Sequence, residues 1–95
     1  MNWKVEKLLN GETIISKEPG NSMTPILKSH QPVLLQPVTL ENINKGDIVY
    51  CKVRGNYYTH LVKSISKDRG CLIGNNHGHN NGWTKQIYGK VIKIL

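Results

Sequence analysis

The sequence predicts a mainly β protein whose antiparallel strands form coiled sheets or a partly open β-barrel. Two observations support this prediction. Short runs rich in Val, Ile, Leu and Tyr recur along the 95 residues, and signals made of Gly, Pro and Asn separate them. The connections between the runs are short, as antiparallel neighbours allow. The length fits a single domain over residues 1–95, with a modest core that a homodimer could supplement.

The first part of the chain carries one segment that fits two structures. Residues 3–9 fit either a short helical turn or a frayed strand. Asn10-Gly11 is a strong turn signal, and residues 12–17 after it predict the first strand. Pro19-Gly20 ends that strand, so the chain changes direction at an exposed corner just before Ser22.

The rest of the chain alternates predicted strands and turns. A Gly55-Asn56 pair indicates a two-residue hairpin turn, and residues 26–27 fit a brief helical turn behind Ser22. Residues 74–82, rich in Gly, Asn and His, predict a loop. The remaining strands are predicted at residues 33–35, 48–53, 57–65, 71–73 and 87–95.

The charge balance is basic but dispersed. Thirteen Lys and Arg against six Asp and Glu give a net charge of +7, and these charges occur singly rather than in blocks. This pattern favours a solvated basic surface over a nucleic-acid stripe. No apolar run approaches the roughly 20 residues of a membrane helix, and residues 1–10 lack the apolar region of a secretory signal. We therefore expect no membrane anchor and a cytoplasmic location.

Two cysteines, Cys51 and Cys71, lie outside any C-x-x-C pattern. In a cytoplasmic protein they are expected to be reduced, half-buried thiols inside strands.

The segment Gly20-Asn21-Ser22-Met23-Thr24-Pro25 gains meaning from four later segments in a fixed order. Gly20-x-Ser22-Met23-x-Pro25 resembles the nucleophile motif of the superfamily of type I signal peptidases and LexA/UmuD-like self-cleaving proteins. The later segments resemble its G-D-hydrophobic-hydrophobic strand start, its base-bearing strand, its G-D-N box and its closing I-x-G-K-V. Here they read Gly46-Asp47-Ile48-Val49, Thr59-His60-Leu61-Val62, Ile73-Gly74-Asn75-Asn76 and Ile87-Tyr88-Gly89-Lys90-Val91. The resemblance covers about residues 12–94 and implies the LexA/signal-peptidase type of fold.

The choice of base follows from elementary chemistry. A serine hydroxyl needs a neighbour that takes its proton, and histidine is mostly neutral near pH 7 whereas lysine must first have its pKa depressed. His60 and Lys63 are three residues apart in a predicted strand, so they point to opposite faces. The motif register selects His60 as the base, with Lys63 as the alternative.

The resemblance also implies where the oxyanion is held. The Ser22 N–H would be the donor, aided by the tight Gly20-Asn21 turn and followed by Met23. Many bacterial signal peptidases carry a second donor, a hydroxyl two residues before the nucleophile. That position is Gly20 in this chain.

One departure concerns the group behind the histidine. Eukaryotic-type members use aspartates in and after the G-D-N box, where this chain has Asn75, Asn80 and Asn81. An amide can hydrogen-bond an imidazole but does not stabilise its protonated form as a carboxylate does. Asp47 or Asp68 is the alternative acid.

These expectations describe a soluble serine endopeptidase that acts on an extended peptide or protein with a Ser-His or Ser-Lys dyad. Processing or maturation is the candidate role. No cofactor or metal is expected. The alternative is a catalytically degenerate peptidase fold that serves as a protein- or nucleic-acid-binding module. The net charge would suit a nucleic-acid partner, although nucleic acid is not the favoured partner because the aromatic side chains are expected in the core. The residues available for stacking and phosphate contacts are Tyr57, Tyr58, Trp83, Tyr88, Arg54, Lys85 and Lys90.

His77-Gly78-His79, with Cys71 nearby in the sequence, fits a metal corner or a solvent-facing loop. A tetrahedral zinc site needs about four ligands at characteristic spacings, which this pattern lacks. We therefore expect a loop.

Overall fold

The computed structural model describes residues 2–95 and is mainly β. Seven strands, one α-helix and one short 3-10 helix follow one another along the described chain. In order they are α1 (Trp3–Leu9), β1 (Ile14–Ser16), β2 (Val33–Pro37), η1 (Leu40–Asn42), β3 (Ile48–Val53), β4 (Asn56–Ser66), β5 (Gly70–Gly74), β6 (Asn80–Thr84) and β7 (Ile87–Ile94).

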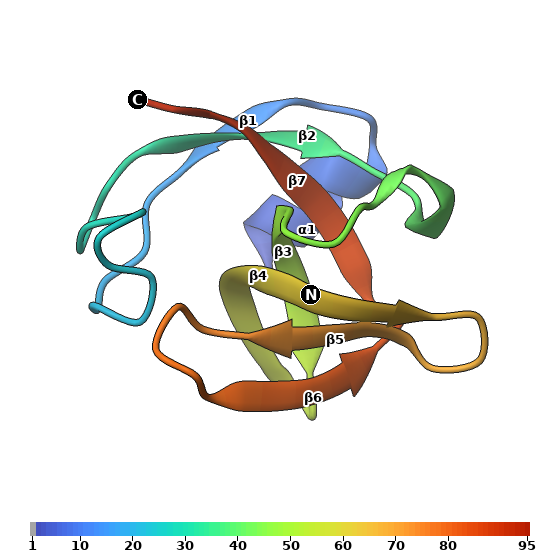
Figure 1. The fold of residues 1–95 in the computed structure, drawn as a ribbon. Coiled ribbons are helices and arrows are strands. Elements are labelled where there is room, and N and C mark those ends of the chain that lie inside the picture. The colour runs from blue at the N-terminus through green and yellow to red at the C-terminus, as the bar shows by residue number, and fades with distance from the viewer. Residues whose placement is uncertain (1) are drawn as a thin grey trace.

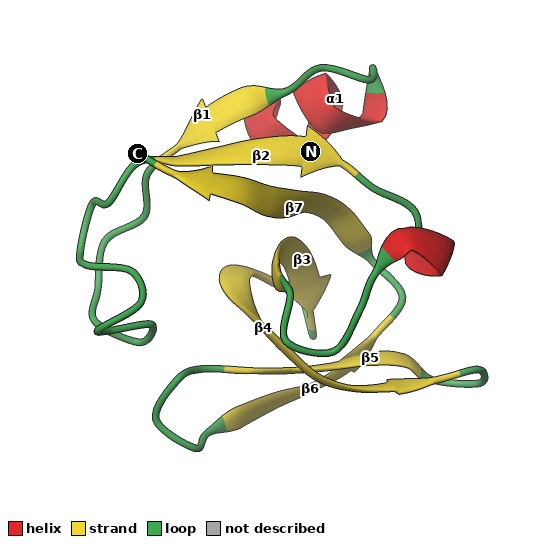
Figure 2. Ribbon diagram, turned by 45° about the horizontal axis from the view of Figure 1, so that its top comes forward, coloured by secondary structure: helices red, strands yellow, loops and turns green. Residues whose placement is uncertain are grey.

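All seven strands belong to one antiparallel sheet in the order β1-β2-β7-β3-β4-β5-β6. The sheet coils strongly: β1, β2 and β7 form one layer, β5 and β6 form the other, and β3 and β4 cross between them (Figures 1 and 2). β1 and β6 remain the two edges, so the sheet is not closed. The prediction of a mainly β, antiparallel and coiled fold is confirmed at this level.

Residues 3–9, for which the sequence allowed either a helical turn or a frayed strand, form the helix α1. Asn2 caps it, since its side-chain oxygen accepts a hydrogen bond from the Val5 N–H at 2.8 Å. The helix buries Val5 and Leu8. A Cβ at Gly89 would lie 3.0 Å from a Leu8 methyl carbon. Glycine at this position of β7 therefore lets the helix pack closely against the sheet.

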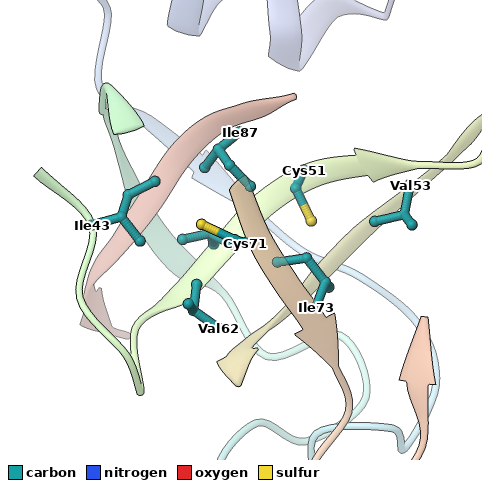
Figure 3. Close-up of a cluster of buried hydrophobic side chains, with 8 residues drawn as sticks. Ile43, Cys51, Val53, Val62, Cys71, Ile73 and Ile87 are labelled. Carbon is teal, nitrogen blue, oxygen red and sulfur yellow. The ribbon is translucent and has the colours of Figure 1, made fainter. Parts of the chain in front are cut away.

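Two apolar clusters hold the sheet together. The first packs between the two layers and contains both cysteines, which are free and fully buried rather than half-buried as the sequence predicted (Figure 3). Burial raises the pKa of the Cys51 thiol to about 12, so this thiol stays protonated. The buried members of this first cluster are Ile43, Val49, Cys51, Val53, Val62, Cys71, Ile73 and Ile87.

The second cluster joins α1 to the sheet and to the segment that carries Ser22. Its buried members are Val5, Leu8, Met23, Leu27, Val33, Leu35 and Tyr50. Met23 and Leu27 come from the irregular segment between β1 and β2, so apolar burial fixes that segment as well as the sheet.

Two sequence expectations are wrong in detail. Within the predicted loop 74–82 only residues 75–79 are a loop, because Gly74 ends β5 and Asn80 begins β6, which pairs with β5. Residues 80–84 form a strand because they pair with β5, although few of them are apolar. The hairpin turn between β3 and β4 is Arg54-Gly55 rather than Gly55-Asn56, since Val53 pairs with Asn56. Both turn residues have positive φ, at 50° and 85°, as a type I′ turn requires.

No helix within residues 2–95 is long and apolar enough to cross a membrane.

Candidate active site

Ser22 lies in a series of hydrogen-bonded turns between β1 and β2. The Leu27 N–H donates to the Met23 carbonyl at 2.9 Å and closes one turn behind the serine. Met23 and Leu27 are 4% and 8% exposed. Their burial in the second cluster holds the turn against the sheet and leaves Ser22 half-buried at the surface.

His60 lies within the long strand β4. It pairs with Val49 of β3, and the next residue pairs with Gly74 of β5. Its side chain is buried, with 7% of the residue exposed. The Tyr58 ring stacks on the imidazole with centroids 4.8 Å apart. The sheet and this aromatic contact restrict the imidazole to one orientation.

Ser22, His60 and Asn81 come together from three separate parts of the chain. Ser22 Oγ is 3.0 Å from His60 Nε2, and His60 Nδ1 is 2.7 Å from Asn81 Oδ1. The amide oxygen only accepts, so Nδ1 carries the imidazole proton. Nε2 is then free to accept the Ser22 hydroxyl proton, which is the arrangement of an activated nucleophile.

Burial is the main cause that lowers the pKa of His60 below its ordinary value of 6.5. The hydrogen bond to Asn81 and the negative charge of Glu18 act in the opposite direction without cancelling it. His60 is therefore neutral near pH 7, which is the state a general base needs.

The other predicted supporting residues lie elsewhere. Asp47 Oδ2 accepts a hydrogen bond from the Asn44 N–H at 2.8 Å and lies 3.4 Å from Lys90 Nζ. Asn75 binds its own loop, where its side-chain oxygen accepts from the N–H groups of His77 and His79. Asn80 opens β6 and is exposed. Asn81 alone among these candidates contacts the imidazole.

Lys63 is at an irregular point of β4. The pairing with β5 shifts register between Val62 and Ser64, so Lys63 is the extra residue of a bulge. Its Cε would be 2.9 Å from a Cβ at Gly74. The Ser22 hydroxyl is hydrogen-bonded to His60 and not to Lys63.

Two backbone N–H groups near Ser22 already donate hydrogen bonds within the segment between β1 and β2. The Gly20 N–H donates to Ser29 Oγ at 3.0 Å, and the Thr24 N–H donates to the Asn21 carbonyl at 3.3 Å. Neither contact involves the Ser22 N–H, which stays the predicted oxyanion donor.

Two hollows meet at Ser22. The first is a small pocket of about 30 Å³ next to Ser22, and its lining includes Ser16, Met23, Leu27 and Val33. A groove of about 250 Å³ continues past Ser22 and His60 along Tyr57, Tyr58 and Thr59. Extended peptide side chains fit such a row of adjacent hollows.

Glu18 borders both hollows and was not predicted from the sequence. Its Oε1 accepts from Thr59 Oγ1 at 3.1 Å and pairs with Lys4 Nζ at 3.3 Å. These contacts hold the segment that follows β1 beside β4 and α1. A lone glutamate before a proline carries no sequence signal for such a role.

Several of the residues considered for a metal or for nucleic acid have other contacts. Cys71 is buried in the first cluster, and His77 Nε2 lies 3.0 Å from the Asn21 carbonyl. No group of three or more His, Cys, Asp or Glu suited to a metal ion occurs within residues 2–95. Tyr57 stacks on Tyr50 with centroids 5.8 Å apart, and the Arg69 guanidinium lies 4.1 Å from the centre of the Trp83 ring.

Comparisons with protein-family models, with curated proteins and with solved structures found no match for this chain.

Proposed function

We propose that this protein is a serine endopeptidase of the signal-peptidase/LexA-like type, in which Ser22 is the nucleophile and His60 the general base. The observation that carries the proposal is the pair of contacts Ser22 Oγ–His60 Nε2 at 3.0 Å and His60 Nδ1–Asn81 Oδ1 at 2.7 Å. A nucleophile, a base and a group that orients the base form the arrangement shared by unrelated acyl-transfer enzymes.

In the proposed reaction Ser22 Oγ attacks the carbonyl carbon of the scissile peptide bond while its proton passes to His60 Nε2. The Ser22 N–H stabilises the oxyanion. His60 then gives the proton to the leaving amine, and the C–N bond breaks to leave an ester on Ser22. A water molecule, deprotonated by His60, hydrolyses this ester and restores the free serine.

The proposed substrate is an extended peptide. β1 is an edge strand that pairs with β2 alone, and the chain continues from it along the small pocket to Ser22. A peptide added to this edge as a further strand would run past the serine hydroxyl. The size of the pocket favours a small side chain next to the scissile bond.

The test is covalent labelling with a fluorophosphonate, followed by intact mass and peptide mapping. We expect one adduct on Ser22 in the wild type and none in Ser22→Ala. Ser64→Ala, which removes a hydroxyl from the strand that carries His60, should label like the wild type. Absence of any adduct on Ser22 between pH 6 and 9 would overturn the proposal.

A second candidate function rests on Asn81. An amide in place of a carboxylate leaves the imidazolium without a negatively charged hydrogen-bond partner, which suits a fold that binds peptides without cleaving them. The same protein, unlabelled by the fluorophosphonate, would then still bind extended peptides at the edge of β1. Titration of Ser22→Ala with a peptide library separates binding from cleavage.

A further inference from the structure

The loop between β5 and β6 is hydrogen-bonded to the turn that carries Ser22. The Asn76 N–H donates to the Ser22 carbonyl at 2.9 Å, and Asn76 Nδ2 donates to the Thr24 carbonyl at 3.0 Å. The two segments lie on the same side of the molecule, far apart in the sequence but neighbours in space (Figures 1 and 2). The backbone of the proposed nucleophile is thus held from outside its own turn.

His77 contacts the same turn with its side chain. Its Nε2 lies 3.0 Å from the Asn21 carbonyl and 3.0 Å from Thr24 Oγ1. The carbonyl only accepts, and it also accepts the Thr24 hydroxyl proton at 2.9 Å. Nε2 therefore carries a proton and donates to both oxygens, which ties the residue before Ser22 to the second residue after it.

The loop has the internal order that such a contact needs. Asn75 Oδ1 accepts from the N–H groups of His77 at 2.8 Å and of His79 at 3.0 Å, and the Asn75 N–H donates to the His79 carbonyl at 2.9 Å. At Gly74 an added Cβ would lie 2.6 Å from Asn80 Oδ1. Glycine lets the two ends of the loop approach closely.

The same hairpin holds both halves of the site. Its loop binds the turn of Ser22, and Asn81, the second residue of β6, binds His60. We infer that the β5–β6 hairpin sets the distance between Ser22 and His60, and that His77 is a positioning residue for the nucleophile. This inference rests on the proposed function. A displacement of about 1 Å at a reacting group can slow a reaction by about 100-fold.

The first experiment compares fluorophosphonate labelling rates of His77→Ala, His77→Gln and His79→Ala. Loss of the imidazole donor should slow labelling about tenfold, the effect of losing one hydrogen bond of about 1.4 kcal/mol. His77→Gln keeps an N–H donor and should restore the rate to within about threefold of the wild type. His79→Ala removes an imidazole from the same loop and should leave the rate unchanged within about twofold.

The pH dependence distinguishes positioning from a direct role in proton transfer. His77→Ala should lower the rate at every pH while the midpoint of the profile stays where His60 places it. An unchanged rate in His77→Ala, or a slow rate that glutamine does not rescue, would contradict the inference.

A second measurement does not depend on catalysis. Amide hydrogen exchange, followed by NMR, reports the bonds of the Asn76 and Thr24 N–H groups to the nucleophile turn. His77→Ala should speed exchange at both about tenfold, and His77→Gln should leave it near the wild-type value. Absence of labelling in the wild type would refute the proposed function alone. Unchanged exchange in His77→Ala would refute the role of His77 alone.

Discussion

The two halves of the candidate site are held by different means. His60 lies in β4, whose backbone pairs with β3 on one side and β5 on the other. Ser22 lies in the irregular segment between β1 and β2, where the fixed points are the buried Met23 and Leu27 and the hydrogen bonds from the β5–β6 loop. The regular sheet positions the base, whereas side chains and a distant loop position the nucleophile.

Ser22 and His60 should therefore respond differently to substitutions around them. A strand with two neighbours keeps its place through many backbone hydrogen bonds, so changes in side chains near His60 should alter chemistry more than geometry. A turn fixed by a few contacts loses its geometry when one of them is removed. Substitutions in the two halves of the site should therefore separate a loss of chemistry from a loss of geometry.

Replacement of the base should have the largest effect. His60→Ala removes the only group hydrogen-bonded to the Ser22 hydroxyl within the described residues. Labelling of Ser22 by the fluorophosphonate should slow by at least about 10³-fold, because general-base assistance is lost. Circular dichroism should remain that of the wild type, since the sheet holds β4 in place. Labelling within threefold of the wild type would place the base elsewhere.

Removal of the Asn81 amide, which orients the His60 imidazole, should have the next largest effect on labelling. Asn81→Ala should slow labelling about 100-fold, because Nδ1 loses the acceptor that fixes its tautomer.

Asn81→Asp is the matched variant. A carboxylate should raise the pKa of His60 and stabilise the imidazolium formed during attack. The plateau rate should therefore rise while the midpoint of the pH–rate profile moves upward. A midpoint that stays in place would show that Asn81 does not face the titrating group.

A pair of core substitutions tests how the nucleophile turn is held. Met23→Ala and Ile73→Ala each delete a buried side chain, one behind Ser22 and one in the first cluster. Both should lower the free energy of unfolding by about 2–5 kcal/mol, measured by urea denaturation. Only Met23→Ala should also slow labelling under conditions where the protein remains folded. Equal slowing in both variants would contradict the local role of Met23.

The stability should depend on pH through His60. Its pKa in the folded protein is below 6.5 because the imidazole is buried, so the unfolded chain binds more protons as the pH falls below about 6.5. The free energy of unfolding should therefore decrease on acidification through this window and become level below the folded pKa. His60→Gln should reduce that decrease in urea denaturation at pH 7.5 and 5.0. An identical decrease in the variant would assign it to other groups.

Most strands could be predicted from the sequence because their apolar runs are bounded by turn residues. The strand at residues 48–53 was predicted at its observed bounds, and β4 within one residue at each end. β6 was missed because Asn80, Asn81 and Gly82 carry no β propensity, and only pairing with β5 makes them a strand.

The site residues also divide into those that the sequence could predict and those that it could not. Ser22 and His60 lie in segments that the sequence singles out, and Asn81 was one of five candidates for support. Which of the five contacts the imidazole depends on the register of β6, which the sequence did not reveal. The roles of Asn76, His77 and Glu18 depend on contacts across about 40 to 60 positions of the chain, which no local pattern encodes.

The smallest effect is expected at Lys63, where a substitution tests whether the base comes from a regularly paired strand position. Burial is the main cause of the lowered pKa of His60, and the positive charge of Lys63 lowers it slightly further. Lys63→Met keeps the length of the side chain and removes the charge, so the midpoint of the pH–rate profile should move slightly upward and the plateau rate should stay within about twofold. A loss of labelling in Lys63→Met, together with full labelling in His60→Ala, would instead make the lysine the base. The proton acceptor would then come from a bulge rather than from a regularly paired strand position, and both halves of the site would depend on irregular backbone.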